Sequence, residues 1–149
     1  MRAMEYKPEV AIIGAGPAGS AAAIHLKHKD VLLIDAAEFP RDKTCGDGLT
    51  PRAMKELDAL GVTLPFHTRG LKLHGFGHTA TIPWQWGVGS AMKRHEFDAL
   101  LYDRAPAKKI TGTATAPEVR NGELVSFRVG DDVVKPRACL LYTSDAADE

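Results

Sequence analysis

The sequence contains 149 residues, of which 44% are hydrophobic and 26% are charged, the mixture of an ordinary soluble domain. Nineteen Lys and Arg side chains balance nineteen Asp and Glu side chains, so the charge predicts no nucleic-acid partner. Two distant cysteines without a signal-peptide pattern indicate a reducing compartment, and no apolar run reaches the about 20 residues of a membrane span. We therefore expect a cytoplasmic protein, with peripheral membrane contact as an open alternative.

The amino-terminal third follows the order strand, turn, helix, strand. An apolar run at Val10–Ile13 predicts a short strand, and the glycine-rich turn "GAGPAG" at residues 14–19 leads into the helix-favouring stretch "SAAAIHL". A second apolar run, "VLLID", ends at Asp35, 21 residues after Gly14, as in a dinucleotide-binding βαβ unit.

The residue types of this unit match the chemistry of a bound pyrophosphate. Gly14 permits the sharp turn, Gly16 has no side chain to block the phosphates, and Gly19 lets the helix lie close to the sheet. The helix N-terminus favours negative charge, and Asp35 can accept hydrogen bonds from an adenosine ribose. The alternative is a glycine-rich turn that closes an unrelated strand–helix unit.

The segment "EFPRDKTCGDGLTPR" at residues 38–52 is longer and richer in glycine than a simple connection requires. Thr50 and Pro51 predict the start of a helix with an apolar face at Met54, Leu57 and Leu60, which Gly61 would end. Residues 45–48 would then precede a helix N-terminus, where their backbone can approach a ligand closely.

Three features of the remaining chain can be interpreted. Phe97, Leu100 and Leu101 are expected in the core, and residues 118–137 predict two strands around the hairpin turn Asn121-Gly122. Trp84 and Trp86 alternate in one stretch, which predicts packing on a sheet or contact with a flavin or a substrate. The six histidines lack metal-ligand spacing, so we expect no metal site.

Four stretches together resemble the amino-terminal part of the geranylgeranyl reductase family of flavoproteins, over residues 7–137. They are "GAGPAGSAAA", the acid after "VLLI", "FPRDKTCGDGLTPRAMKELDALG" and "MKRHEFDALLYDRA". The KxCGxG loop with "LTPR" looks closest to bacterial members that reduce prenyl double bonds of menaquinone or geranylgeranyl groups. The resemblance implies an α/β, Rossmann-like FAD-binding fold with an antiparallel β insertion, here truncated before the second half of the domain.

The resemblance also implies roles for individual residues. The family turn that binds the FAD pyrophosphate matches Gly14, Gly16, Ala18 and Gly19, and its ribose-binding acid matches Asp35. The loop along the flavin matches Cys45, Gly46 and Gly48, a basic residue that reaches the cofactor matches Arg94, and a position near the adenine matches Ala114. Two plainer interpretations stay open: Cys45 as a small buried side chain, and Arg94 paired with Asp98 on a solvated helix face.

The implied function is an FAD-dependent oxidoreductase that reduces prenyl double bonds of an isoprenoid or another hydrophobic small molecule, with NAD(P)H or ferredoxin as electron donor. The resemblance assigns no catalytic residue within this chain. One alternative is a flavin-dependent monooxygenase or halogenase that acts on an aromatic substrate, and the Cys-Gly-Asp-Gly loop favours the reductase over it. Another is a non-catalytic nucleotide-binding fragment.

The last eleven residues, "CLLYTSDAADE", break the family pattern. They look like the in-frame translation of a sequencing-library adapter. We therefore predict an FAD-binding portion over residues 1–138 and a non-native tail over residues 139–149, and expect that deletion of this tail leaves solubility and nucleotide affinity unchanged.

Overall fold

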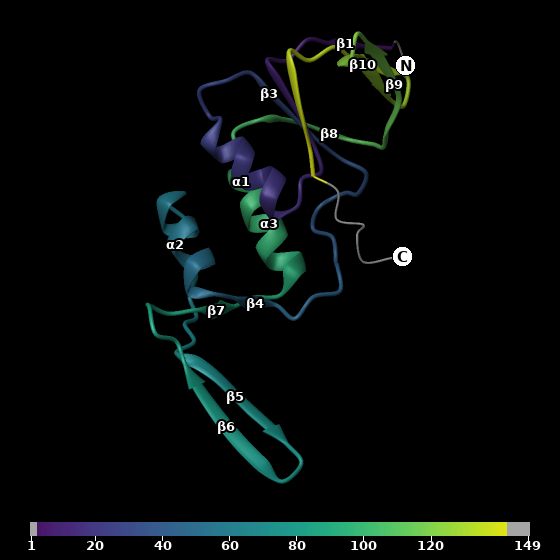
Figure 1. The fold of residues 1–149 in the computed structure, drawn as a ribbon. Helices are drawn as coiled ribbons and strands as arrows, with labels where there is room; N and C mark the ends of the chain where they lie inside the picture. Colours follow the sequence, from purple (N-terminus) through teal and green to yellow (C-terminus); the bar gives the residue numbers. More distant parts are fainter. Residues whose placement is uncertain (1–2, 143–149) are drawn as a thin grey trace. The chain divides into compact units, whose positions relative to one another are not determined.

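The predicted strand–turn–helix–strand unit is confirmed. In the computed structural model, which describes residues 3–142, β2 spans Val10–Ile13, α1 spans Pro17–His25 and β3 spans Val31–Asp35 (Figure 1). β-Branched side chains favour the extended backbone of the strands. Pro17 suits the first position of α1, where the backbone N–H has no intrahelical acceptor.

The chain divides into two compact units, with the boundary inside the first turn of α3, Arg94–Arg104. Unit 1 is formed by Met1–Arg41 and Phe97–Glu149, and unit 2 by Asp42–Glu96. Among the described residues, none of the helices has the length and apolar character needed to span a bilayer.

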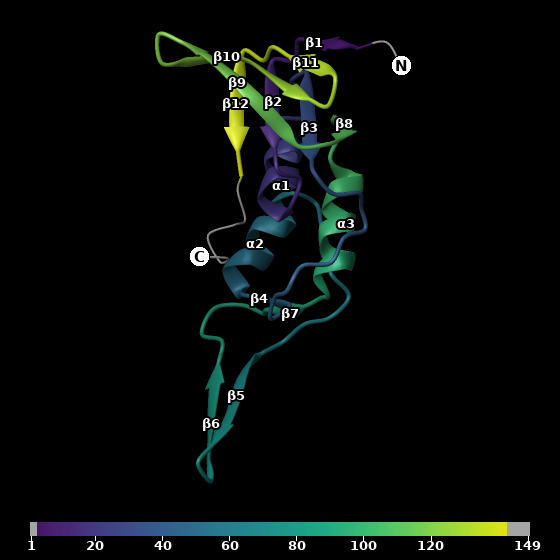
Figure 2. The same ribbon diagram turned by 90° about the vertical axis from the view of Figure 1, so that its right-hand side faces the viewer.

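Unit 1 contains two four-stranded sheets. The first is parallel in the order β12-β2-β3-β8, where β8 is Lys108–Thr111 and β12 is Ala138–Leu141 (Figure 2). The second has the order β1-β11-β10-β9, with β1 at Glu5–Tyr6, β9 at Ala114–Arg120, β10 at Glu123–Val129 and β11 at Asp132–Val134. This α/β arrangement with an antiparallel addition is the expected fold class.

Both faces of the parallel sheet are buried. Successive side chains of β2 and β3 point to opposite faces, and each face is covered by other parts of unit 1. One face packs against the second sheet and the other against helices of unit 1. The first cluster contains Ala11, Leu32 and Ile34 with Phe127 and Val129, and the second contains Ile12, Val31 and Leu33 with Ala23 and Ala105. This sandwiching explains why the two strands read as continuous apolar runs.

Unit 2 begins with the predicted helix. Helix α2 spans Pro51–Ala59, the Thr50 hydroxyl accepts a hydrogen bond from the Ala53 N–H at 3.3 Å, and Met54 and Leu57 are buried. Two short strands, β4 at Gly48–Leu49 and β7 at Ser90–Ala91, pair antiparallel. A separate antiparallel hairpin is formed by β5, Gly70–Gly75, and β6, His78–Pro83 (Figure 1).

The expectation that both tryptophans pack on a sheet is wrong. Strand β6 ends at Pro83, and Trp86 is 82% exposed. Trp84 is half-buried, and its indole N–H donates to the Thr68 hydroxyl at 3.3 Å. The strand does not continue through the tryptophans, although the Trp84 backbone N–H still donates to the Arg69 carbonyl at 2.8 Å, so apolar residues at alternate positions do not by themselves predict a strand.

The structure bears on two expectations for the carboxy-terminal part, the hairpin at Asn121-Gly122 and the tail at residues 139–149. The hairpin turn at Asn121-Gly122 is confirmed, although its strands start earlier, at Ala114, and a third strand, β11, follows. Residues Cys139–Leu141 belong to β12, which pairs in parallel with β2, so deletion of these three residues would remove described structure. The non-native origin of residues 139–149 stays a prediction, and residues 143–149 lie outside the described part.

Candidate cofactor site

Two glycines of the turn between β2 and α1 are required by the backbone itself. Gly14 has a φ of +99°, which L side chains rarely adopt, and its N–H donates to the Ile34 carbonyl at 2.8 Å. A Cβ on Gly19 would overlap the carbonyl oxygen of Gly14. The first turn of α1 can therefore lie against β2 only because both positions are glycine.

Within residues 3–142, no side chain caps the N-terminus of α1. Gly16 occupies the N-cap position, its carbonyl accepts from the Ser20 N–H at 2.9 Å, and Ala18 is exposed in the first turn. Without a capping side chain, the first N–H groups of the helix keep their capacity to bind an acceptor. This end of the helix is suited to an anion such as a phosphate.

Arg41 lies beside this turn, although the sequence analysis assigned it no role. A Cβ on Gly16 would stand 3.2 Å from the Arg41 Nη2 atom. The Arg41 Nε atom is buried and has no hydrogen-bond partner among the described residues. A buried N–H without an acceptor is unfavourable by about 1–3 kcal/mol, so this position calls for a ligand oxygen.

A buried carboxylate holds the Arg41 side chain in place. The Arg41 Nη2 atom lies 3.5 Å from Asp98 Oδ2, and Asp98 is fully buried. The guanidinium also lies 5.2 Å from the centre of the Phe39 ring, which stacks on Tyr102 with 4.1 Å between ring centroids. The interpretation of Asp98 as part of a solvated helix face is therefore wrong, because its carboxylate faces the interior of unit 1.

Backbone N–H groups near the glycine-rich turn hold the Asp35 carboxylate, which was expected to bind the ribose. Its Oδ2 accepts from the Ala15 N–H at 2.7 Å, its Oδ1 accepts from the Ala37 N–H at 3.0 Å, and Arg41 Nε lies 3.9 Å from Oδ1. The side chain is 13% exposed. Because each carboxylate oxygen has two lone pairs, acceptor capacity for ribose hydroxyls is retained.

The Cys45 loop is organised within unit 2 by Asp47. The Asp47 carboxylate accepts from the Arg94 backbone N–H at 3.2 Å, and the Asp47 carbonyl accepts from the Met92 N–H at 3.0 Å. Asp47 adopts a φ of +54°, a region that Asp tolerates better than most residues. Asp47 thus joins the loop to the segment that begins α3.

Cys45 is exposed, which contradicts its interpretation as a small buried side chain. The Asp47 backbone N–H and the Arg94 side chain, both as hydrogen-bond donors, hold the pKa of the Cys45 thiol below its usual value. The sequence-predicted residues Cys45 and Arg94 are therefore brought together. A thiolate in such surroundings is more available as a nucleophile.

The glycines of this loop have no internal reason to be glycine. A Cβ on Gly46 would meet nothing within 4 Å, a Cβ on Gly48 would meet only the Gly46 carbonyl at 3.7 Å, and neither residue has a positive φ. Nothing in the described chain competes for the space beside them. This differs from Gly14 and Gly19, whose hydrogens point at neighbouring backbone.

Ala114 starts β9, opposite Val129, and packs at the border of the core between the two sheets. Two residues earlier, the Gly112 N–H donates to the Asp35 carbonyl at 2.8 Å. The segment before Ala114 is thus attached to the end of β3. Its contact with an adenine stays a prediction. Among the described residues, no three His, Cys, Asp or Glu side chains gather in a way that could hold a metal ion.

Comparison with known proteins identifies this arrangement. A family model described as FAD binding domain matches residues 7–137. The chain belongs to this family of FAD-binding domains. The family confirms FAD, the cofactor that the resemblance implied.

Known relatives confirm the resemblance to the geranylgeranyl reductase family of flavoproteins. This FAD-binding domain is 45% identical to a menaquinone reductase of Mycolicibacterium smegmatis over 123 residues. The alignment covers 74% of the chain and 30% of the relative. It is 30% identical to a geranylgeranyl diphosphate reductase of Rhodobacter capsulatus over 156 aligned positions. This alignment covers 95% of the chain and 38% of the relative. The chain therefore spans about a third of the length of these relatives.

A solved structure of a flavin-dependent brominase matches the fold with a TM-score of 0.80 at 24% identity, covering 93% of this chain and 38% of the brominase. The confirmed fold is thus shared with a flavin-dependent brominase. Sequence reasoning missed Arg41, Asp98 and Asp47 as site residues. Arg41 and Asp47 lie in the segment at residues 38–52 whose length and glycine content were unusual, but nothing in the sequence pairs Arg41 with an acid on a later helix.

Proposed function

We propose that unit 1 binds the adenosine and pyrophosphate of FAD. The proposal rests most on the Arg41 Nε atom beside the N-cap of α1, a buried donor that lies 3.9 Å from the Asp35 carboxylate and has no hydrogen-bond partner among the described residues. Gly14, Gly16, Ala18 and Gly19 would receive the pyrophosphate together with Arg41, and Asp35 would receive the ribose. Ala114 would lie toward the adenine.

We propose that the Cys45 loop of unit 2 borders the flavin. The support is the family resemblance together with two glycines, Gly46 and Gly48, that the chain's own packing does not require. Arg94 would act through its charge, as a donor to the cofactor and to the Cys45 sulfur. These residues bind and orient, and no catalytic residue is assigned.

The whole protein is proposed to be an FAD-dependent oxidoreductase that reduces a prenyl double bond. When bound, reduced FAD supplies the hydride that, with one proton, saturates the carbon–carbon double bond and leaves the flavin oxidised. Menaquinone or a geranylgeranyl group is the proposed substrate class, from the names of the two relatives. NAD(P)H or ferredoxin is the proposed reductant, and peripheral membrane contact is proposed because such substrates are lipids.

The monooxygenase or halogenase alternative has weaker support. The brominase shares the fold at 24% identity, whereas the menaquinone reductase is 45% identical over most of the chain. Reduction and halogenation can be separated by product mass, since reduction adds two hydrogens to the isoprenoid. The idea that the chain works only as a nucleotide-binding module stays a prediction.

Cofactor binding is tested by titrating the purified chain with FAD, with ADP as a competitor because ADP carries the adenosine and pyrophosphate portions. We expect ADP to displace FAD, and Arg41→Met to weaken both ligands by roughly tenfold or more, the effect of one lost charge-assisted hydrogen bond. Arg52→Met, an exposed arginine of α2, is the matched control and should leave both affinities unchanged. Failure of the chain to bind FAD, or equal affinities for Arg41→Met and wild type, would contradict the proposal.

The reductase assignment needs the longer protein. Incubated with a chemical reductant and menaquinone or geranylgeranyl diphosphate, it should yield an isoprenoid heavier by two hydrogens. A halogenated or hydroxylated aromatic product in place of this would replace the assignment with the alternative.

A further inference from the structure

The buried side of helix α1 contains a serine. The buried residues of the helix are Gly19, Ser20 and Ala23, and Ser20 is fully buried. The Ser20 hydroxyl donates to the Ala15 carbonyl, with 2.8 Å between Oγ and O. Serine forms helices less readily than alanine, which occupies the next three positions, so a buried serine at this place calls for a reason.

The Ser20 hydroxyl fixes the direction of a peptide plane. The Ala15 carbonyl and the Gly16 N–H belong to one planar trans peptide, so they point in opposite directions. Because the carbonyl is held toward Ser20, the Gly16 N–H is directed away from Ser20. The Ser20 backbone N–H also donates to the Gly16 carbonyl, at 2.9 Å. Ser20 therefore holds the peptides on both sides of Gly16.

The peptides before Gly16 are held from β3. Asp35 Oδ2 accepts from the Ala15 N–H at 2.7 Å, and the Gly14 N–H donates to the Ile34 carbonyl at 2.8 Å. Successive peptides of the glycine-rich turn are thus bound either to β3 or to α1. The bonds of the Asp35 carboxylate and the Ser20 hydroxyl are made by side chains, so substitution can remove them one at a time.

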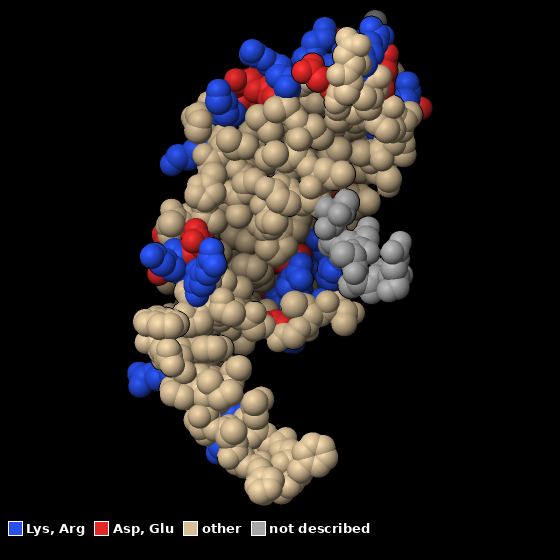
Figure 3. Space-filling view, in the orientation of Figure 1, with Lys and Arg blue, Asp and Glu red and all other residues tan. Residues whose placement is uncertain are grey.

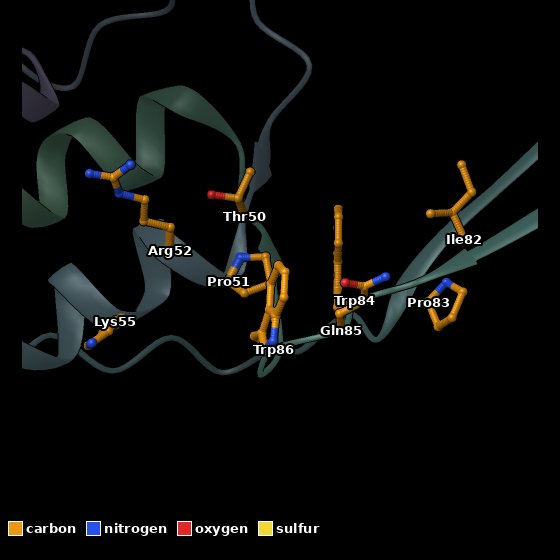
Figure 4. Close-up of a pocket in the computed structure, with 9 residues that line it drawn as sticks. All are labelled: Thr50, Pro51, Arg52, Lys55, Ile82, Pro83, Trp84, Gln85 and Trp86. Carbon is orange, nitrogen blue, oxygen red and sulfur yellow. The ribbon is translucent and has the colours of Figure 1, made fainter.

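Helix α2 begins in a different way. Thr50 is its N-cap, and the Thr50 hydroxyl accepts from the Ala53 N–H at 3.3 Å; Figure 4 draws Thr50 and Pro51 at this helix start. In α1 the N-cap is Gly16, and the hydroxyl of Ser20 acts as a donor from inside the helix. A cap like Thr50 occupies an N–H of the first turn, whereas the Ser20 bond occupies none. The Ser20 bond can therefore order the turn and leave these N–H groups to an anion.

The direction of the backbone matters because α1 has no charged side chains of its own. It contains no Lys, Arg, Asp or Glu, and the surface over it is tan in Figure 3. An anion at its N-terminus would be held by backbone N–H groups and by Arg41, whose Nη2 atom lies 3.2 Å from the place of a Cβ on Gly16. A hydrogen bond weakens steeply as the N–H turns away from its acceptor, so the orientation of the Gly16 peptide would affect affinity.

We propose that Ser20 is a positioning residue of the cofactor site, which directs the Gly16 N–H toward the FAD pyrophosphate by holding the Ala15 carbonyl. The inference deepens the proposed function and rests on it, because it requires the pyrophosphate to bind at this turn. Ser20 itself contacts no ligand, since its side chain is fully buried. Loss of its hydroxyl should therefore weaken ligands that carry a pyrophosphate and spare ligands that reach only Asp35.

The test compares ADP with adenosine on the purified chain and its Ser20→Ala variant, by NMR titration, which also measures weak binding. ADP carries the pyrophosphate and the ribose, whereas adenosine carries the ribose alone. We expect Ser20→Ala to lower the affinity for ADP by roughly three- to tenfold, the effect of one neutral hydrogen bond, and to leave the affinity for adenosine unchanged. Asp35→Ala should weaken both ligands. Unchanged adenosine binding also shows that the Ser20→Ala site is folded.

Ser90→Ala is the matched control. Ser90 is buried in unit 2, and its hydroxyl donates to the Phe66 backbone carbonyl, so this variant removes the same kind of bond from the other unit. It should bind ADP like wild type. A second measurement needs no ligand, because the residual dipolar coupling of the Gly16 N–H reports its direction. This coupling should change in Ser20→Ala, relative to the couplings of β2, and stay the same in Ser90→Ala.

Three results would overturn the proposal: wild-type affinity of Ser20→Ala for ADP, equal losses of ADP and adenosine affinity, or an unchanged Gly16 coupling. Equal losses would mean that Ser20 only stabilises the helix. In each of these cases the unsubstituted chain still binds ADP and FAD, so the inference fails and the proposed function stands. If the unsubstituted chain binds neither ADP nor FAD, the proposed function fails and this inference fails with it.

Discussion

The Asp35 carboxylate accepts a hydrogen bond from the Ala15 backbone N–H, with 2.7 Å between Oδ2 and N, and so joins the end of β3 to the glycine-rich turn. Its other oxygen accepts from the Ala37 N–H at 3.0 Å. The acid proposed to bind the ribose therefore also shapes the turn proposed to bind the pyrophosphate. Stability and nucleotide affinity should depend on the same side chain.

Replacing Asp35 with Ala removes both acceptors. We expect the free energy of unfolding to fall by about 1–3 kcal/mol and FAD affinity to fall roughly tenfold to a hundredfold. Urea unfolding and FAD titration measure the two effects. Asp132→Ala is the matched control, because the half-buried Asp132 also accepts from a backbone N–H, that of Met4, at 2.8 Å. Retention of full FAD affinity by Asp35→Ala would remove Asp35 from the site.

Two glycines should respond oppositely to substitution by Ala. Gly19→Ala places a Cβ on the Gly14 carbonyl oxygen, so it should lower the thermal midpoint strongly and abolish nucleotide binding with it. Gly46→Ala meets no atom within 4 Å, so the thermal midpoint should be unchanged, while FAD affinity falls because a ligand would occupy that space. Equal FAD affinity for Gly46→Ala and wild type would show that the loop does not border the cofactor.

The reactivity of Cys45 should extend to lower pH than that of an ordinary thiol. The Asp47 N–H and Arg94 lower the pKa of Cys45, whereas burial raises the pKa of Cys139. Because the thiolate is the reactive form, alkylation of Cys45 by iodoacetamide should reach half its maximal rate at a lower pH. In a Cys139→Ser background, Arg94→Gln should move this profile to higher pH. Lys93→Gln, which changes a neighbouring charge outside the described contact, should leave it in place.

The fold of unit 1 could be predicted where local sequence determines local structure. Strands Val10–Ile13 and Val31–Asp35 were predicted with their observed bounds, because apolar runs buried on both faces end at a glycine and at an acid. The Asn121-Gly122 turn was predicted because only a few residue pairs adopt its backbone readily. The Thr50 cap of α2 was found for the same kind of reason.

What the sequence could not supply are contacts between distant residues. The Arg41–Asp98 pair joins a loop to a later helix, and no periodicity or motif links the two positions. The β5–β6 hairpin was missed because Phe76-Gly77 is not a recognised turn pair, and the tryptophans after it imitate the alternation of a strand. The first failure falls at Arg41, for which we propose a ligand contact.

The contribution of strand β12 to stability can be tested separately from the prediction that residues 139–149 are non-native. Ending the chain at Tyr142 keeps β12, in which Cys139, Leu140 and Leu141 pair with β2 and Leu140 packs against the core on the helix side of the sheet. Ending it at Ala138 removes that pairing and leaves β2 as a sheet edge. We expect the chain ending at Tyr142 to unfold like the 149-residue chain, and the chain ending at Ala138 to lose roughly 2 kcal/mol or more, from backbone hydrogen bonds and apolar burial.

Single substitutions refine this prediction without changing chain length. Leu140→Ala should destabilise more than Leu141→Ala, because Leu140 packs against the core while Leu141 is 64% exposed. Urea unfolding of the two shortened chains, the two variants and the 149-residue chain measures the differences. Equal stability of the chains ending at Ala138 and Tyr142 would show that β12 adds nothing to the sheet. The coding DNA beyond the Ala138 codon tests the separate prediction of a non-native tail. An adapter sequence there would mean that a foreign peptide pairs with β2. Such pairing uses backbone hydrogen bonds, which any sequence of suitable apolar pattern can form.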